Sequence, residues 1–198
     1  MEVNVRKNYI NSSSPFAVTE FSNLISHYIL EEFKEKENLV ILCIGTDRST
    51  GDSLGPLVGH KLSPSLRTFR DAHIIGTLDN PVHALNLESN IKRIYEDHKD
   101  PFIIAIDSSL GNKNKVGLLS IKNIPLKPGS GVNKVLPAVG DISITGIVNI
   151  GGMMEFMVLQ NTRLSLVMNM AEIISRSIYL ALVKVYREQN KENMRKTL

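Results

Sequence analysis

Residues 39–45 read LVILCIG, a continuous apolar run that stops at a glycine. Strands buried on both faces, as in parallel sheets, have unbroken apolar sequences of this length, whereas half-exposed strands alternate. Residues 102–106 read FIIAI and have the same character, and Asp107 follows them directly. These two segments predict buried strands of a parallel sheet.

Helical and strand-like patterns alternate through the rest of the chain. Apolar residues recur three and four positions apart from Phe21 to Phe33, as on the buried face of a helix. The predicted helices cover residues 15–36, 54–62, 83–98 and 163–188, and the further strands cover residues 72–78, 116–121 and 142–150. Such alternation is typical of βαβ units, with helices on both faces of a mostly parallel sheet. The predicted fold is therefore a three-layer α/β/α sandwich.

The length of 198 residues fits one domain. We expect residues 1–198 to form a single domain, with residues 1–14 as an N-terminal extension and residues 189–198 as a frayed basic tail. The net charge is +3, and residues 184–198 carry this whole excess, with five basic against two acidic side chains. Cations near the end of a helix complement its dipole, so the charge is explained without a nucleic acid. We expect no direct nucleic-acid partner.

Cysteine content and hydropathy limit the class of protein. The single cysteine, Cys43, excludes an internal disulfide and a zinc site built from cysteines. The sequence has no run of about 18 apolar residues, and residues 1–15 lack the apolar segment of a signal peptide. We therefore expect a cytoplasmic protein without a membrane segment. The methionines at positions 153, 154, 157, 168 and 170 are expected to fill core space, which leaves a homo-oligomer open.

Two aspartates are associated with the predicted buried strands. Asp52 lies in the loop of residues 45–56 after the first strand, and Asp107 ends the strand of residues 102–106. Sites in open α/β sheets lie beyond the carboxyl ends of the strands, so we expect these two carboxyls to meet. Two neighbouring carboxyls do not both ionise easily, which leaves one as an acid and the other as a base that activates water. The pair therefore favours acid–base hydrolysis.

Other interpretations of the same residues stay open. The two aspartates are equally suited to hold a divalent metal, with Asp79 or His83 as a third ligand. In a purely structural interpretation, Asp52 caps the next helix and Asp107 caps a turn. Nucleotide binding is disfavoured, because the glycines of residues 45–56 match neither common phosphate-binding motif.

A third feature is the loop of residues 127–131, which reads KPGSG. Consecutive N–H groups in such a loop can form an anion-binding nest for a substrate oxygen. An ordinary turn explains the same residues equally well.

Three motifs, in this order along the chain, resemble a known family. They are residues 43–46 (CIGT) continuing into 51–56 (GDSLGP), residues 104–108 (IAIDS) and residues 127–132 (KPGSGV). Through them the chain resembles the YyaC-type sporulation proteins of spore-forming bacteria over most of its length. In the motifs alone it is similar to the spore germination protease and to the hydrogenase maturation proteases. The resemblance implies the phosphorylase/hydrolase-like α/β sandwich that these proteases share.

The resemblance also implies roles for individual residues. Asp52 and Asp107 coincide with two aspartates that are implicated in catalysis in the germination protease. The histidine that binds nickel in the hydrogenase maturation proteases falls near Gly129, where this chain has none. We therefore expect neither a metal nor another cofactor. Substrate contacts are expected from Gly129, Ser130, Gly131, Asp79 and His83.

The resulting functional hypothesis is a sporulation-associated peptidase of the germination protease-like type. It would cleave protein or peptide substrates, such as spore proteins, with its aspartate pair, in the cytoplasm of the forespore or mother cell. Two alternatives remain: a metal-dependent hydrolase like the maturation proteases, and a non-catalytic sporulation factor that binds a protein partner in the same cleft.

Overall fold

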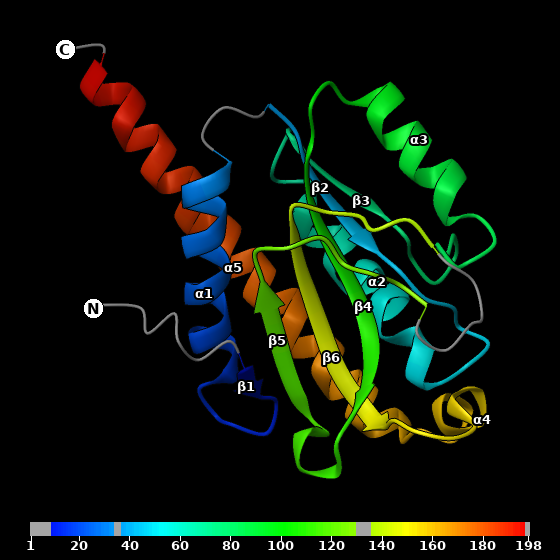
Figure 1. Ribbon diagram of the computed structural model, residues 1–198. Helices are drawn as coiled ribbons and strands as arrows, with labels where there is room; N and C mark the ends of the chain where they lie inside the picture. Colours follow the sequence, from blue (N-terminus) through cyan, green and yellow to red (C-terminus); the bar gives the residue numbers. More distant parts are fainter. Residues whose placement is uncertain (1–8, 34–36, 130–135, 197–198) are drawn as a thin grey trace.

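The computed structural model describes residues 9–33, 37–129 and 136–196. Its centre is a six-stranded sheet with the strand order β1-β5-β6-β4-β2-β3 (Figure 1). The strands are β1 (Tyr9–Asn11), β2 (Leu39–Cys43), β3 (Ala72–Ile75), β4 (Phe102–Gly111), β5 (Leu118–Lys122) and β6 (Ile142–Ile150). The predicted buried strands therefore form, and both lie inside the sheet.

The sheet is mostly parallel, as predicted. Strand β2 pairs in parallel with β3 and β4, and β4 pairs in parallel with β6. Strand β5 runs antiparallel to β6, and β1 runs antiparallel to β5. Within the predicted N-terminal extension of residues 1–14, Tyr9–Asn11 form an edge strand of the sheet. Three residues are too few for a periodic pattern to be visible in the sequence.

Helices cover both faces of the sheet, which confirms the three-layer α/β/α architecture. They are α1 (Ala17–Glu32), α2 (Leu54–Leu66), α3 (Leu87–Asp97), α4 (Glu155–Gln160) and α5 (Leu164–Lys196), with the short 3-10 helices η1 (Gly51–Ser53) and η2 (Lys113–Lys115). Helices α1, α2 and α5 lie on one face, and α3 lies on the other (Figure 1).

The core consists of two layers, one on each side of the sheet. Leu39, Ile41 and Cys43 of β2 pack into the layer beneath α1, α2 and α5. Val40 and Leu42 pack into the layer beneath α3. Side chains alternate between the two faces of a strand, so a strand covered on both sides must be apolar at every position. All five residues of β2 are fully buried accordingly.

Helix α2 sits directly on the end of β2. A Cβ atom added to Gly55 would lie 2.1 Å from the carbonyl oxygen of Ile44, so only glycine permits this approach. The close contact fixes the start of α2, and with it the preceding η1, above the carboxyl end of the strand.

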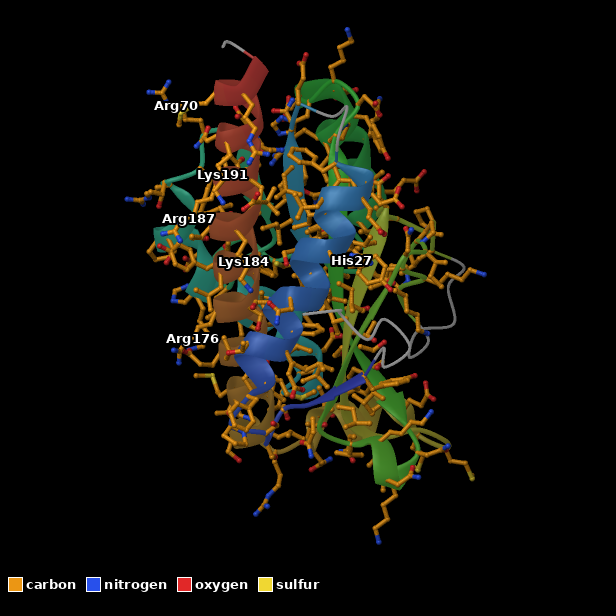
Figure 2. All side chains as sticks on the ribbon, turned by 90° about the vertical axis from the view of Figure 1, so that its left-hand side faces the viewer. His27, Arg70, Arg176, Lys184, Arg187 and Lys191 are labelled. Carbon is orange, nitrogen blue, oxygen red and sulfur yellow. The ribbon has the colours of Figure 1, made fainter. Side chains whose placement is uncertain are left out.

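Helix α5 continues to Lys196, eight residues beyond the predicted end at 188. The prediction of a frayed tail from residue 189 is therefore wrong up to Lys196, because residues 189–196 contain neither proline nor glycine and extend the helix. Figure 2 shows Arg176, Lys184, Arg187 and Lys191 along α5, beside α1. Lys184 also joins the two helices, since its Nζ donates hydrogen bonds to Ser22 Oγ at 3.1 Å and to Asn23 Oδ1 at 2.5 Å.

The length and composition of α5 match those of a membrane-crossing helix over Leu164–Lys191. More than half of its most apolar window is nevertheless buried inside the fold. In this position α5 packs against α1 and α2, and a core helix of a soluble domain has the same apolar character.

The expectation that the methionines fill core space is wrong for four of the five. Met170 is fully buried in α5. The other four are exposed and lie on or near α4 or on the outer side of α5: Met153, Met154, Met157 and Met168. Sequence proximity to Met170 gave no indication of this, because none of the residues of the short helix α4 is buried.

Candidate active site

A cavity of about 360 Å³ opens near the carboxyl ends of β2 and β4. Its walls come from the loop after β2, from β4, from the loops around residues 83–85 and 128–129, and from α4. Asp52, Asp107, His83 and Gly129 all line it. Four of the predicted site residues, which are far apart in the sequence, therefore meet in one place.

Asp107 lies within β4, not after it. The strand runs on to Gly111 because β6 continues alongside, with Asp107 paired to Thr145 and Ser108 to Gly146. The prediction that the strand ends before Asp107 is therefore wrong. The consequence is a carboxyl held by the sheet itself, 8% exposed and accepting a hydrogen bond from the Ser108 N–H at 2.7 Å.

Asp52 lies on η1, the single turn that leads into α2. Its backbone carbonyl accepts a hydrogen bond from the Thr46 N–H at 3.1 Å, which ties η1 back to the end of β2. Gly45 makes this possible: its φ is +139°, and a Cβ atom there would lie 2.0 Å from the Asp52 carbonyl oxygen. The N-cap of α2 is Ser53, and within the described residues no side chain caps that helix. The interpretation of Asp52 as a helix cap therefore has no support in this geometry.

The two carboxyls are electrostatically coupled. Burial raises the pKa of Asp107 well above its ordinary value, and the neighbouring Asp52 charge raises it further, against the opposing hydrogen bond from Ser108. Burial also raises the pKa of Asp52, although a backbone hydrogen bond from Thr46 and the charge of His83 lower it in part. Asp107 is therefore the carboxyl that keeps a proton, and Asp52 is the one that ionises first.

His83 is held in place by its own loop. Its backbone N–H donates to Asn86 Oδ1 at 2.8 Å, and its Nδ1 accepts a hydrogen bond from the Leu85 N–H at 3.3 Å. His83 thus stands at the wall of the cavity, where its charge acts on Asp52.

The predicted glycine loop contributes in part. Pro128 and Gly129 line the cavity, and Gly129 has a φ of +85°, a conformation that favours glycine. Ser130 and Gly131, the other two predicted contacts, lie outside the described residues. The proposed anion-binding nest therefore stays a prediction.

Asp79 does not line this cavity. It follows the edge strand β3 and lines a second cavity of about 530 Å³, together with Asn80, Asn86 and Arg93. The prediction that Asp79 joins the other two aspartates in one site is wrong, because β3 places it beyond His83, which borders both cavities. Among the described residues, no three His, Cys, Asp or Glu side chains gather closely enough to hold a metal ion.

Sequence reasoning missed the wall formed by α4. Phe156, Leu159 and Gln160 line the cavity, and α4 packs against η1, the element that carries Asp52. Asn149, near the end of β6, anchors this wall by donating from Nδ2 to the Val158 carbonyl at 3.1 Å and to Thr162 Oγ1 at 3.2 Å. The available signal was the pair Gly151–Gly152 after the last strand, which separates β6 from a short new element.

A family model described as "Protein of unknown function (DUF1256)" matches residues 9–177. The chain belongs to the DUF1256 family. Its cavity lies wholly within the matched region, whereas the last part of α5 lies beyond it.

One relative of the chain is "Uncharacterized protein YyaC" of Bacillus subtilis (strain 168). It is 48% identical over 175 residues, which cover 88% of this chain and 83% of the relative. Among solved structures, a [NiFe] hydrogenase maturation protease, HycI from Thermococcus kodakarensis KOD1, is similar with a TM-score of 0.48 and 18% identity. That match covers 76% of this chain and 98% of the protease.

Proposed function

We propose that this member of the DUF1256 family is a peptidase that hydrolyses peptide bonds with Asp52 and Asp107. The observation that carries the proposal is the coupled pair of carboxyls, both with raised pKa values, in one cavity at the carboxyl ends of β2 and β4. Titratable groups with pKa values perturbed by burial and by a specific charged partner cluster in the clefts of functional sites.

The chemistry follows from the difference between the two carboxyls. Ionised Asp52 takes a proton from a water molecule as the water oxygen attacks the peptide carbonyl carbon. Protonated Asp107 donates its proton to the amide nitrogen as the C–N bond breaks. One water is consumed, a new carboxyl and a new amine are released, and the proton on Asp52 then restores the starting state of the pair by transfer to Asp107. His83 favours the ionised form of Asp52 in this cycle.

The biological setting belongs to the same proposal. The resemblance to YyaC-type sporulation proteins and to the germination protease supports a substrate that is a protein or peptide of a sporulating cell. We place the enzyme in the cytoplasm of the forespore or mother cell, with spore proteins as the first substrates to try.

The test is cleavage of spore proteins and of hydrogenase-type precursors by the wild type, Asp52→Asn and Asp107→Asn. Both substitutions preserve side-chain size and remove the proton chemistry, so both should abolish cleavage. The matched control is Asp79→Asn, which changes an aspartate of the second cavity only. Equal cleavage by the wild type and by both site variants would refute the proposal.

A further inference from the structure

The cavity with the two aspartates is lined mostly by apolar surface. Five large apolar side chains on four different segments contribute to this lining: Leu85, Leu110, Leu136, Phe156 and Leu159. We call these five residues the apolar wall. A few fixed polar groups inside an apolar pocket of this size are typical of a site that binds part of a ligand.

Two members of the apolar wall are unusually exposed. Leu85 is 81% exposed and Phe156 is 60% exposed, although both border the cavity. The backbone N–H of Leu85 donates a hydrogen bond to His83 Nδ1 at 3.3 Å, and α4, which carries Phe156, packs against η1. Large apolar side chains that are exposed beside one cavity are typical of a binding surface.

Three further exposed apolar side chains lie close to Phe156 in the sequence. Met153, Met154 and Met157, which flank Phe156 in sequence, are 89%, 65% and 50% exposed. The methionine side chain is flexible and adapts to differently shaped apolar partners. The surface is therefore suited to several apolar sequences rather than to one fixed shape.

The shape of the site decides between possible occupants. A second copy of this chain would need to cover a broad surface, since stable interfaces bury about 800 Å² on each partner. Here the apolar wall and the two carboxyls line one cavity of about 360 Å³. A narrow segment enters such a cavity, and a folded surface does not. The occupant that fits both the carboxyls and the apolar wall is an extended polypeptide with a large apolar side chain.

We propose that the apolar wall is a specificity pocket, which seats a large apolar side chain of the substrate next to the peptide bond presented to Asp52 and Asp107. The inference rests on the proposed peptidase function and names its substrate class: polypeptides with Leu, Met or Phe beside the cleaved bond. The second cavity, beyond His83, is lined mainly by polar groups and takes no part in this choice.

The first experiment measures binding without catalysis. Fluorescent peptides that carry Leu, Phe, Ala or Lys at one central position are titrated into Asp107→Asn protein, with or without Phe156→Ala or Leu85→Ala. The peptides with Leu or Phe should bind roughly 10-fold more tightly than the peptide with Ala, and either wall substitution should remove this difference. Tyr95→Ala is the matched control, because Tyr95 is a helical aromatic with 57% exposure that lines neither cavity.

The second experiment measures cleavage of the same peptides by otherwise wild-type protein. Phe156→Ala should lower kcat/KM roughly 10-fold for the Leu and Phe peptides and leave the Ala peptide unchanged. Cleavage that favours Lys, or equal effects of Phe156→Ala and Tyr95→Ala, would overturn the specificity pocket and leave the peptidase standing. Intact apolar binding with no cleavage of any peptide would instead refute the peptidase alone. A dimer that Phe156→Ala converts to monomer would also overturn the pocket, because a second copy would then cover it.

Discussion

Two cavities share His83 in their walls, and they differ in the number of carboxyl groups that line them. The cavity near β2 and β4 holds Asp52 and Asp107, whose pKa values are raised by burial and, for Asp107, by its partner. The cavity beside β3 is larger and more polar, but its aspartate, Asp79, has no second carboxyl on the same wall among the described residues. The difference follows from strand position. The interior strands β2 and β4 lead to two neighbouring carboxyls whose pKa values are raised by burial, whereas Asp79 follows the edge strand β3.

The largest expected effect is the difference in kcat/KM between substitutions at Asp107 and at Asp79. Asp107→Asn removes the proton donor and should lower kcat/KM at least about 100-fold, and Asp52→Asn should do the same by removing the base. Asp79→Asn should change it less than about threefold, since Asp79 lies in the other cavity. Steady-state kinetics on one peptide substrate measures all three. Comparable losses of kcat/KM for Asp79→Asn and Asp107→Asn would contradict the assignment of the active site to the cavity near β2 and β4.

The glycines that shape the cavities give the next effect. A Cβ atom at Gly45 would lie 2.0 Å from the Asp52 carbonyl, and one at Gly76 would lie 1.9 Å from the Cys43 carbonyl. Alanine at either position should destabilise the fold by about 1–3 kcal/mol, measured by urea unfolding. Only Gly45→Ala should also lower the activity of the folded fraction, by about 10-fold, because it displaces Asp52. A similar loss with Gly76→Ala would contradict the assignment of the site to the first cavity.

The pH dependence of stability should separate Asp107 from ordinary aspartates. Its raised pKa means that the folded state keeps this proton at pH values where the unfolded chain, with an ordinary carboxyl pKa of about 3.9, has lost it. Stability is therefore lost as pH rises from that value through the folded-state pKa. Each tenfold difference in proton affinity corresponds to about 1.4 kcal/mol.

Asp107→Asn cannot ionise, so at neutral pH it should unfold at a higher urea concentration than the wild type. The difference should shrink as the pH falls and disappear at about pH 3, below the ordinary carboxyl pKa of about 3.9, where the wild-type carboxyl is protonated in both states. A wild type as stable as Asp107→Asn at neutral pH would show that burial does not perturb this carboxyl.

The smallest effect concerns His83, which borders both cavities. Its charge lowers the pKa of Asp52, but only as the third contribution after burial and the hydrogen bond from Thr46. His83→Asn should therefore move the acid limb of the pH–rate profile slightly upward and lower the maximal rate less than about 10-fold. A downward shift of that limb would contradict the proposed sign of the interaction.

The sequence predicted the parts of this picture that depend on local pattern. Unbroken apolar runs located β2 and β4, and the rule that sites lie at carboxyl ends brought Asp52 and Asp107 together. The prediction from sequence failed where pairing with a neighbouring strand determines how far a strand extends. Asp107 lies inside β4 because β6 continues beside it, and that pairing joins residues almost forty positions apart.

The remaining misses have the same origin in tertiary structure. Asp79 was assigned to the wrong cavity because nothing in its own sequence reveals that β3 is an edge strand. Helix α4 was missed because six residues give less than two turns of apolar periodicity. Phe156 therefore became visible as part of the site only when its position beside η1 was known.

The central claim is that Asp52 and Asp107 act as one coupled pair, and a carbon-13 NMR titration of their carboxyls tests it most directly. The account predicts that Asp107 titrates well above the ordinary carboxyl range in the wild type. In Asp52→Asn its pKa should fall, yet stay elevated, because the neighbouring charge is removed while burial remains. An Asp107 that titrates in the ordinary range, or that does not respond to Asp52→Asn, would contradict the account.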